Sequence, residues 1–251
     1  MKNKSSVIAG IVGLFALAQV GAAEAQPYNW TGFYAGANAG YASGSSDTVS
    51  LLNQSPPSPG ALEVNSHWSP TLHPNGFSGG MQAGYNRQWG SWVFGGELDM
   101  NSFATSDQKT DTNVYPGFAP TTYTIHTKVD TDWLFTLRPR IGWAANNWLF
   151  YVTGGLAVTD MHANWRINDM SGNFESASAS ATRAGGIVGG GIEIGLTPQW
   201  SLKAEYLYMS FGSISANSVF TVVGPGGFGI PSSHTADLNS SLGRVGVNYR
   251  F

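Results

Sequence analysis

The sequence predicts an antiparallel β-barrel that crosses a membrane with eight strands in an up-and-down meander. Three observations support this all-β fold class: segments of alternating apolar and polar residues, long connections that alternate with short ones, and a low content of charge. Only 11% of the 251 residues are charged, whereas 42% are hydrophobic and 33 are glycine. A soluble domain usually carries about 25% charged residues, so the composition favours strands that present one face to lipid.

Eight segments show the period-two alternation of β-strands. A tilted strand needs about 9 to 11 residues to cross a bilayer, and every segment is at least that long. The segments lie at residues 32–42, 77–87, 92–102, 131–144, 148–159, 183–196, 200–210 and 240–251.

The connections between these segments alternate between long and short. Residues 43–76, 103–130, 160–182 and 211–239 are long and rich in Ser, Asn, Thr, Pro and Gly, whereas residues 88–91, 145–147 and 197–199 are tight turns. Barrels of bacterial outer membranes have long outer loops and short periplasmic turns. We therefore expect four long outer loops, with both ends of the barrel domain on the periplasmic side.

The N-terminal segment has the features of a secretory signal peptide. Lys2 and Lys4 precede an uncharged apolar stretch at residues 7–20, and Ala23-Glu24-Ala25 matches a small-x-small cleavage site. We expect cleavage after Ala25, which divides the chain into a signal peptide at 1–25 and a barrel domain at 26–251. The alternative, a membrane anchor, is disfavoured because the apolar stretch is short for a spanning helix.

The polar face of the predicted strands carries charges that we place in the barrel lumen. Arg138 and Arg140 are opposite in phase to the apolar residues of the same segment, and Glu97 and Asp99 have the same inward phase on the preceding one. An eight-stranded barrel has room only for its own side chains, so we expect these two arginines to pair with these two acids. The rest of the expected lumenal network, on the other wall, is Glu193, Lys203, Glu205 and Arg244.

Aromatic residues gather at both ends of the predicted strands. Two girdles of this kind mark the two interfaces of a membrane-spanning barrel. A soluble β-sandwich would bury these rings and expose the charges, but it would explain neither the signal peptide nor the alternating connections. Toward the short turns we place Trp30, Phe33, Tyr85, Trp89, Trp92, Phe94, Trp143, Trp148, Phe150, Trp200, Tyr249 and Phe251, and toward the outer end Tyr41, Phe77, Phe103, Trp133, Phe135, Tyr206 and Tyr208.

Four motifs resemble the small outer-membrane β-barrel proteins of alphaproteobacteria, which are porin-like, OmpA-type barrels related to surface antigens and opacity proteins. The resemblance covers the chain from about residue 28 to the end, apart from the predicted outer loops, and implies a Gram-negative outer-membrane location. The third of these motifs is the most specific. They are WTGFYAG at 30–36, YVTGGLA at 151–157, LTPQWSLKAEYLY at 196–208 and GRVGVNYRF at 243–251.

The last strand of the resembled family is the signal that the outer-membrane assembly machinery reads. By this resemblance Val245, Val247, Tyr249 and Phe251 serve as the assembly signal here. An exposed strand edge pairs readily with another strand, which is compatible with that role. The alternative is that these four residues only provide the lipid-facing side of the last strand.

The residues give little support for catalysis, and we expect no enzyme, no cofactor and no metal site. The chain has no cysteine nucleophile, and the glycine-rich segment 185–195 is a predicted strand with no helix to hold a phosphate. All five histidines fall in predicted loops. Imidazole is a common ligand of metals and haem iron, and relatives in the resembled family are credited with haemin binding, so the speculative loop ligands are His67, His73, His126, His162 and His234.

Three functions are compatible with these features. The first is a structural surface barrel that contributes to envelope integrity and displays its outer loops. The alternatives are a narrow porin for small solutes and a loop-borne receptor for haemin or a partner surface. The expected partners are outer-membrane lipid, lipopolysaccharide and the β-barrel assembly machinery, with no nucleic acid, because the net charge is only −3. We expect a monomer, and the sequence leaves an oligomer open.

Overall fold

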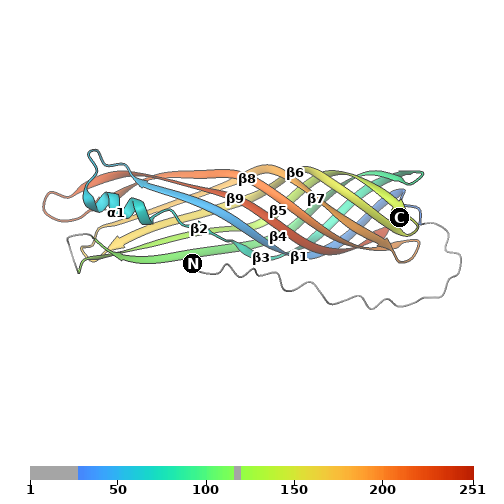
Figure 1. Ribbon diagram of the computed structural model, residues 1–251, viewed down its shortest axis with the longest axis horizontal. Coiled ribbons are helices and arrows are strands. Elements are labelled where there is room, and N and C mark those ends of the chain that lie inside the picture. Colours follow the sequence, from blue (N-terminus) through green and yellow to red (C-terminus); the bar gives the residue numbers. More distant parts are fainter. Residues whose placement is uncertain (1–27, 116–119) are drawn as a thin grey trace, which may run out of the picture.

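The computed structural model describes residues 28–115 and 120–251 (Figure 1). The predicted signal peptide and its cleavage site after Ala25 lie outside the described residues. Among the residues that are described, no helix combines the length and the apolar character needed to cross a membrane.

In the described part of the chain, the wall is a ring of eight long strands, each antiparallel to its neighbours, and the pairing of β1 with β9 closes the ring. This arrangement confirms the predicted antiparallel meander. The sheet has nine strands rather than eight, because the short β2 (Thr71–Leu72) pairs with β1 beside the ring. The long strands are β1 (Gly32–Leu52), β3 (Asn75–Trp89), β4 (Trp92–Val114), β5 (Thr122–Ala145), β6 (Trp148–Asp169), β7 (Phe174–Gly195), β8 (Trp200–Val222) and β9 (Phe228–Arg250).

Tight turns join the strands at one end of the ring, where the C-terminus also lies (Figure 1). The turns span residues 90–91, 146–147 and 196–199. Gly90 has a φ of +60° and Asn146 a φ of +54°, which is the left-handed region that glycine and asparagine tolerate best. The helix α1 (Pro59–His67) lies at the opposite end. We call these two ends the short-turn end and the α1 end.

The expectation of four long outer loops is wrong, because most of these segments are strand. β1 continues to Leu52, β4 to Val114 and β8 to Val222, so the wall extends well past the predicted strand ends. The side chains still alternate in these extensions, but their polarity is inverted. On β6, Met161 and Trp165 point inward and are buried, while the outward side is polar. A polar outer face is the reason why the sequence suggested loops there.

Near the α1 end the ring opens into two facing sheets. β3 begins only at Asn75, so this strand does not reach the α1 end of the ring. The ladder between β7 and β8 is interrupted between Phe174 and Gly186. One sheet therefore contains the ends of β4, β5, β6 and β7, and the other contains those of β8, β9 and β1 together with β2. An apolar core fills the space between the sheets and includes Trp68, Phe103, Ile125, Met161, Trp165, Ile167, Phe220 and Leu238.

The helix α1 closes one side of this apolar core. Its N-cap is Ser58, whose hydroxyl accepts a hydrogen bond from the Ala61 backbone N–H at 3.2 Å, and Pro59 occupies the first turn, where no backbone donor is needed. Val64 and Trp68 are buried against the two sheets. The helix therefore fills the space that β3 leaves where it ends.

Between the short-turn end and the core, the outer face of the wall is apolar. Exposed residues there include Leu98, Met100, Leu137, Val152, Leu156, Val188, Leu202 and Val245. Exposed aromatic rings flank this band on both sides, as expected for two girdles. Trp30 and Phe103 are corrections to the predicted girdles, because both are buried inside the barrel. Their positions follow the inward phase of their strand or segment rather than its lipid-facing phase.

Candidate functional site

The most distinctive site is a cluster of buried charges inside the apolar band of the barrel. All eight residues expected in the lumen are buried in the interior. Four are carboxylates and four are cations, so the formal charge of the cluster is zero. The residues come from five strands: Glu97 and Asp99 from β4, Arg138 and Arg140 from β5, Glu193 from β7, Lys203 and Glu205 from β8, and Arg244 from β9.

Arg138 is the centre of this network. Its Nη2 lies 2.6 Å from Glu97 Oε1 and 2.8 Å from Asp99 Oδ2, and its Nη1 lies 3.0 Å from Glu205 Oε1. Its Nε donates to Thr136 Oγ1 at 3.0 Å. One guanidinium therefore joins the acids of β4 to an acid of β8 across the lumen. Such charge-assisted bonds are shorter and stronger than neutral ones.

The other cations also cross the lumen instead of forming a separate wall. Lys203 Nζ donates to both oxygens of Glu97, at 2.7 and 2.9 Å. Arg244 lies 2.7 Å from Glu205 and 3.1 Å from Asp99. The cations of β8 and β9 therefore reach the acids of β4, which the strand pattern does not reveal.

Arg140 contacts one of its two expected partners, Glu97, but its shorter ion pair is with Glu193. Its guanidinium lies 3.3 Å from Glu193 and 3.7 Å from Glu97, and its Nε donates to Asn86 Oδ1 at 2.8 Å. In the β4–β5 ladder Arg140 is opposite Gly95, whereas Asp99 is opposite Thr136. Because those two levels are four positions apart on β5, Arg140 pairs with Glu193 and Glu97 but not with Asp99.

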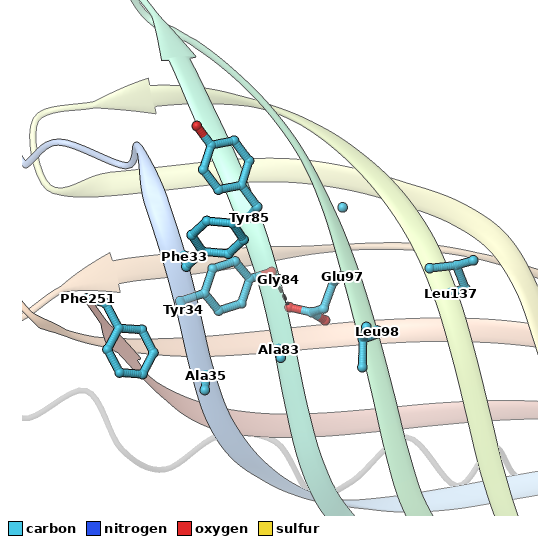
Figure 2. A pocket seen from close by; sticks show the side chains of 11 residues that line it. Phe33, Tyr34, Ala35, Ala83, Gly84, Tyr85, Glu97, Leu98, Leu137 and Phe251 are labelled. Carbon is cyan, nitrogen blue, oxygen red and sulfur yellow. Dashed lines mark hydrogen bonds between the residues drawn. The ribbon is translucent and has the colours of Figure 1, made fainter.

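Tyrosine rings support the charges on the short-turn side. The Arg140 guanidinium lies over the rings of Tyr34 and Tyr151, 4.7 and 5.1 Å from their centroids, which is cation–π geometry. The Tyr34 hydroxyl donates to Glu97 Oε2 at 2.8 Å, and Figure 2 shows that its ring passes beside Gly84 to reach that carboxylate. A side chain at Gly84 would collide with this ring. The missing Cβ therefore lets a residue of β1 reach β4 across β3.

We call this cluster of buried charges, together with Tyr34 and Tyr151, the plug. The charged and tyrosine side chains fill the interior at this level, and each cation contacts at least one carboxylate. An ion that passed through would have to displace pairs that are buried and hydrogen-bonded, and breaking a buried pair costs about 3 to 5 kcal/mol. The chemistry of this site is therefore electrostatic stabilisation of a closed barrel.

A second polar cluster lies inside the apolar core near the α1 end, and sequence reasoning missed it. His234 Nε2 lies 2.7 Å from Glu175 Oε1, and His234 Nδ1 lies 2.9 Å from Ser50 Oγ. Ser218 and Ser232 also donate to the Glu175 carboxylate. The hydrogen bonds run from serine to histidine to carboxylate, as in a catalytic triad, through Ser50, His234 and Glu175. All three side chains are buried in the core, so a substrate cannot reach the serine.

The environment of Glu175 keeps its carboxylate ionised. Burial raises the pKa of this group, but the hydrogen bonds from His234, Ser218 and Ser232 lower it by more, so that the pKa lies below its ordinary value. Two rings enclose the imidazole: Trp165 is stacked on it at a centroid distance of 5.2 Å, and Trp68 meets it edge-on at 4.9 Å. The sequence signal for this cluster is on β9, where the inward positions Ser232 and His234 lie between inward apolar residues.

The five histidines are not all in loops, and this expectation is wrong. His126 lies on β5, His162 on β6 and His234 on β9. His67 ends α1, and His73 lies between β2 and β3. The strand extensions place them there. Because both ring nitrogens of His234 have partners in the core, that residue is not free to bind an outer ligand.

His162 is the histidine whose surroundings could hold a metal ion. Its Nε2 lies 3.2 Å from Asp160 Oδ2 and 3.8 Å from Asp132 Oδ2, and the three ligand atoms lie within 4.8 Å of one another. Asp160 Oδ1 also accepts hydrogen bonds from the backbone N–H groups of Asp132 and Trp133. These bonds hold the two strands together at a β-bulge, which is a sufficient structural role for the acid.

The four residues of the expected assembly signal lie at the short-turn end of β9 or directly after it. Val245, Val247 and Tyr249 point outward into the apolar band, and Phe251 is 80% exposed. The Tyr249 ring lies 5.1 Å from Trp200 and 5.3 Å from Phe251, centroid to centroid. They form a continuous apolar and aromatic row on the lipid-facing side.

The matching family model and the sequence relatives agree with this architecture. Residues 12–251 match the family described as outer membrane protein beta-barrel domain. The 31 kDa outer-membrane immunogenic protein of Brucella melitensis biotype 1 is 31% identical over 264 residues, which cover 99% of this chain and 100% of that protein. The 22 kDa outer membrane protein of Rhizobium leguminosarum bv. viciae is 29% identical over 56% of each chain. The crystal structure of Neisserial surface protein A aligns at 15% identity and a TM-score of 0.39, covering 88% of this chain and 98% of that one. The chain therefore belongs to the outer membrane protein beta-barrel domain family, and it is a protein of the outer membrane.

Proposed function

We propose that the protein is a structural surface barrel, which contributes to envelope integrity and displays the α1 end outside the cell. The observation that carries this proposal is the plug of four carboxylates and four cations in the lumen. A barrel built to conduct needs a hydrated path, whereas this interior is filled by paired side chains. In this proposal the protein has no catalytic role.

The partners that this role requires are the membrane itself and the machinery that inserts the barrel. The apolar band and its two aromatic girdles would contact the hydrocarbon layer and the head groups of lipid and lipopolysaccharide. The row of Val245, Val247, Tyr249 and Phe251 is accessible on the outer face of β9, which supports its proposed reading by the assembly machinery. In the apolar band the ring of strands is closed and needs no second chain to satisfy its edges, which supports a monomer.

Planar-bilayer recording of the purified protein tests the central claim. The native barrel should give no stable channel, or one far smaller than that of an open porin. A variant in which Arg138, Lys203 and Arg244 are all replaced by Ala should conduct if it folds, because the plug has then lost three of its four cations. Long-lived conductance of the native protein would contradict the proposal and favour the narrow porin.

A strain that lacks the protein tests the role in the envelope. Loss of the protein should increase sensitivity to detergents and to large antibiotics, and native protein should restore resistance. Unchanged sensitivity in the deletion strain would contradict a contribution to envelope integrity. Comparison of cells that produce native protein with cells that produce the conducting variant separates this role from leakage.

A further inference from the structure

The wall of the barrel has an open seam between β7 and β8 near the α1 end. The two strands pair at Phe174 and Thr221, and the regular ladder resumes only at Gly186 and Ser210. Between these points β7 pairs with β6 and β8 pairs with β9, but no ladder joins β7 to β8. Each strand therefore presents an edge of backbone N–H and C=O groups without a strand partner.

Exposure of the interior side chains shows that solvent reaches the seam. Ala179, Ala181 and Arg183 of β7 point inward and are half-buried. Their direct partners on β6 are Ala163, Met161 and Thr159, all of which are 0% exposed. Residues that are paired in an antiparallel ladder point to the same side of the sheet. The difference therefore arises from the missing neighbour on the β8 side.

The chain covers its other opening with its own residues. Where β3 ends, β2 adds to the edge of β1 through the pairs Ser46–Leu72 and Asp47–Thr71, and α1 fills the space behind it. No comparable strand or helix among residues 28–115 and 120–251 pairs with the seam between β7 and β8. The fold thus shows how such an edge is covered, and no such cover lies on the edge of β7 in the described residues.

The edge of β7 lacks the usual protection against strand addition. Proteins protect exposed edges with lysine, proline or β-bulges. From Ser176 to Thr182 the strand alternates small hydroxyl residues outward with alanine inward, and it contains none of these features. The edge of β8 is less regular, because Gly212 has a φ of +70° and the β8–β9 register shifts between Ser210 and Ser213.

An arginine lies at the inner end of this edge. Arg183 is opposite Thr159 and has the same inward phase. Among the described residues, its Nε is buried without a hydrogen-bond partner. A buried guanidinium N–H without an acceptor is costly. A carboxylate is the group that best matches the donors of arginine.

We propose that β7, from Ser176 to Thr182, binds an extended acidic peptide segment of another protein by strand addition. The backbone of the peptide would pair with the free edge, and an inward-pointing carboxylate of the peptide would meet Arg183. Main-chain pairing gives such complexes their affinity, and alternate side chains give them specificity. This interaction is additional to the structural role of the barrel. It is independent of whether the barrel conducts ions.

Full-length protein in lipid nanodiscs tests the proposal with three synthetic peptides. The first alternates threonine and valine with one central aspartate, the second carries lysine in place of the aspartate, and the third has prolines that prevent strand pairing. The aspartate peptide should bind and slow amide hydrogen exchange at residues 176–182, while the other two should bind at least tenfold more weakly. Equal binding of the three peptides, or no change in exchange, would overturn the proposal.

Variants of Arg183 separate the charge from the backbone contribution. Arg183→Ala should weaken the aspartate peptide about tenfold, and Arg183→Glu should reverse the preference toward the lysine peptide. Arg87→Ala, which removes an exposed arginine from β3 near the short-turn end, is the matched control and should have no effect. The band shift of unboiled samples verifies that each variant is folded. If residues 176–182 become protected as protein concentration rises without peptide, a second copy occupies the edge and the proposal is wrong.

Discussion

Removal of the Arg138 guanidinium should strongly destabilise the barrel. Arg138 donates to three carboxylates, those of Glu97, Asp99 and Glu205, at 2.6 to 3.0 Å. A hydrogen bond to a charged group contributes about 1.5 to 3 kcal/mol, but the losses do not add fully. Glu97 keeps its bond to Lys203 at 2.7 Å, and water can enter the space left by the side chain. We therefore expect Arg138→Ala to lower the free energy of unfolding by about 3 kcal/mol, the lower part of the range for a broken buried pair.

Urea unfolding of the protein in lipid vesicles, followed by tryptophan fluorescence, measures this loss. Arg166→Ala is the control, because that arginine is exposed and should change the unfolding free energy by less than about 0.5 kcal/mol. Combining Arg138→Ala with Asp99→Asn makes the plug neutral again and should recover part of the loss. A loss for Arg138→Ala no larger than that of the control would refute the view that the plug stabilises the barrel.

Three further outcomes follow from the structure. Gly84→Val should destabilise the barrel by about 1 to 3 kcal/mol in the same urea assay, because its side chain would collide with Tyr34; Gly186→Val, at an open position, is the control. Because the pKa of Glu175 is lowered from 4.5 in the folded protein, its ionised form stabilises the fold above pH 4.5, and this contribution is lost as pH falls through the lower folded value. Native protein should therefore lose more stability on acidification than Glu175→Gln, and equal pH profiles would exclude the effect. Phe251→Ala should reduce the amount of heat-modifiable barrel in outer-membrane fractions if the proposed assembly signal is correct, whereas a normal yield would leave this ring with a lipid-facing role only.

The sequence was sufficient to predict the membrane-embedded part of the barrel. Strand phase alone placed Glu97 and Arg138 on the inner face, because side chains alternate strictly along a strand. The register of neighbouring strands then determines which of these charges form ion pairs. The pairing of Glu97 with Arg138 follows from adjacent strands, but the contact of Lys203 with Glu97 crosses the lumen. Such a contact depends on the curvature of the closed ring and on side-chain length, which the pattern of one strand does not contain.

The part near the α1 end could not be predicted in the same way. Glu175 and His234 are far apart in sequence and meet only because two sheets face each other there. α1 was missed because it is short and carries few apolar residues, and its position depends on Val64 and Trp68 filling the space where β3 ends. Local propensity is weak evidence for a nine-residue helix of this kind, because tertiary packing provides most of its stability.

Inversion of side-chain polarity along a strand indicates where the strand leaves the membrane. On β9, Val245 faces outward and Arg244 inward in the apolar band, whereas farther along the same strand Asp237 faces outward and Leu238 is buried. The alternation persists through both regions, and only the solvent of the outer face changes from lipid to water. A search for apolar residues on one fixed face therefore stops at the membrane boundary and assigns the remainder to a loop. A search for alternation of either polarity would have continued to the true end of the strand, because the buried Leu238 and Ala236 preserve the period of two.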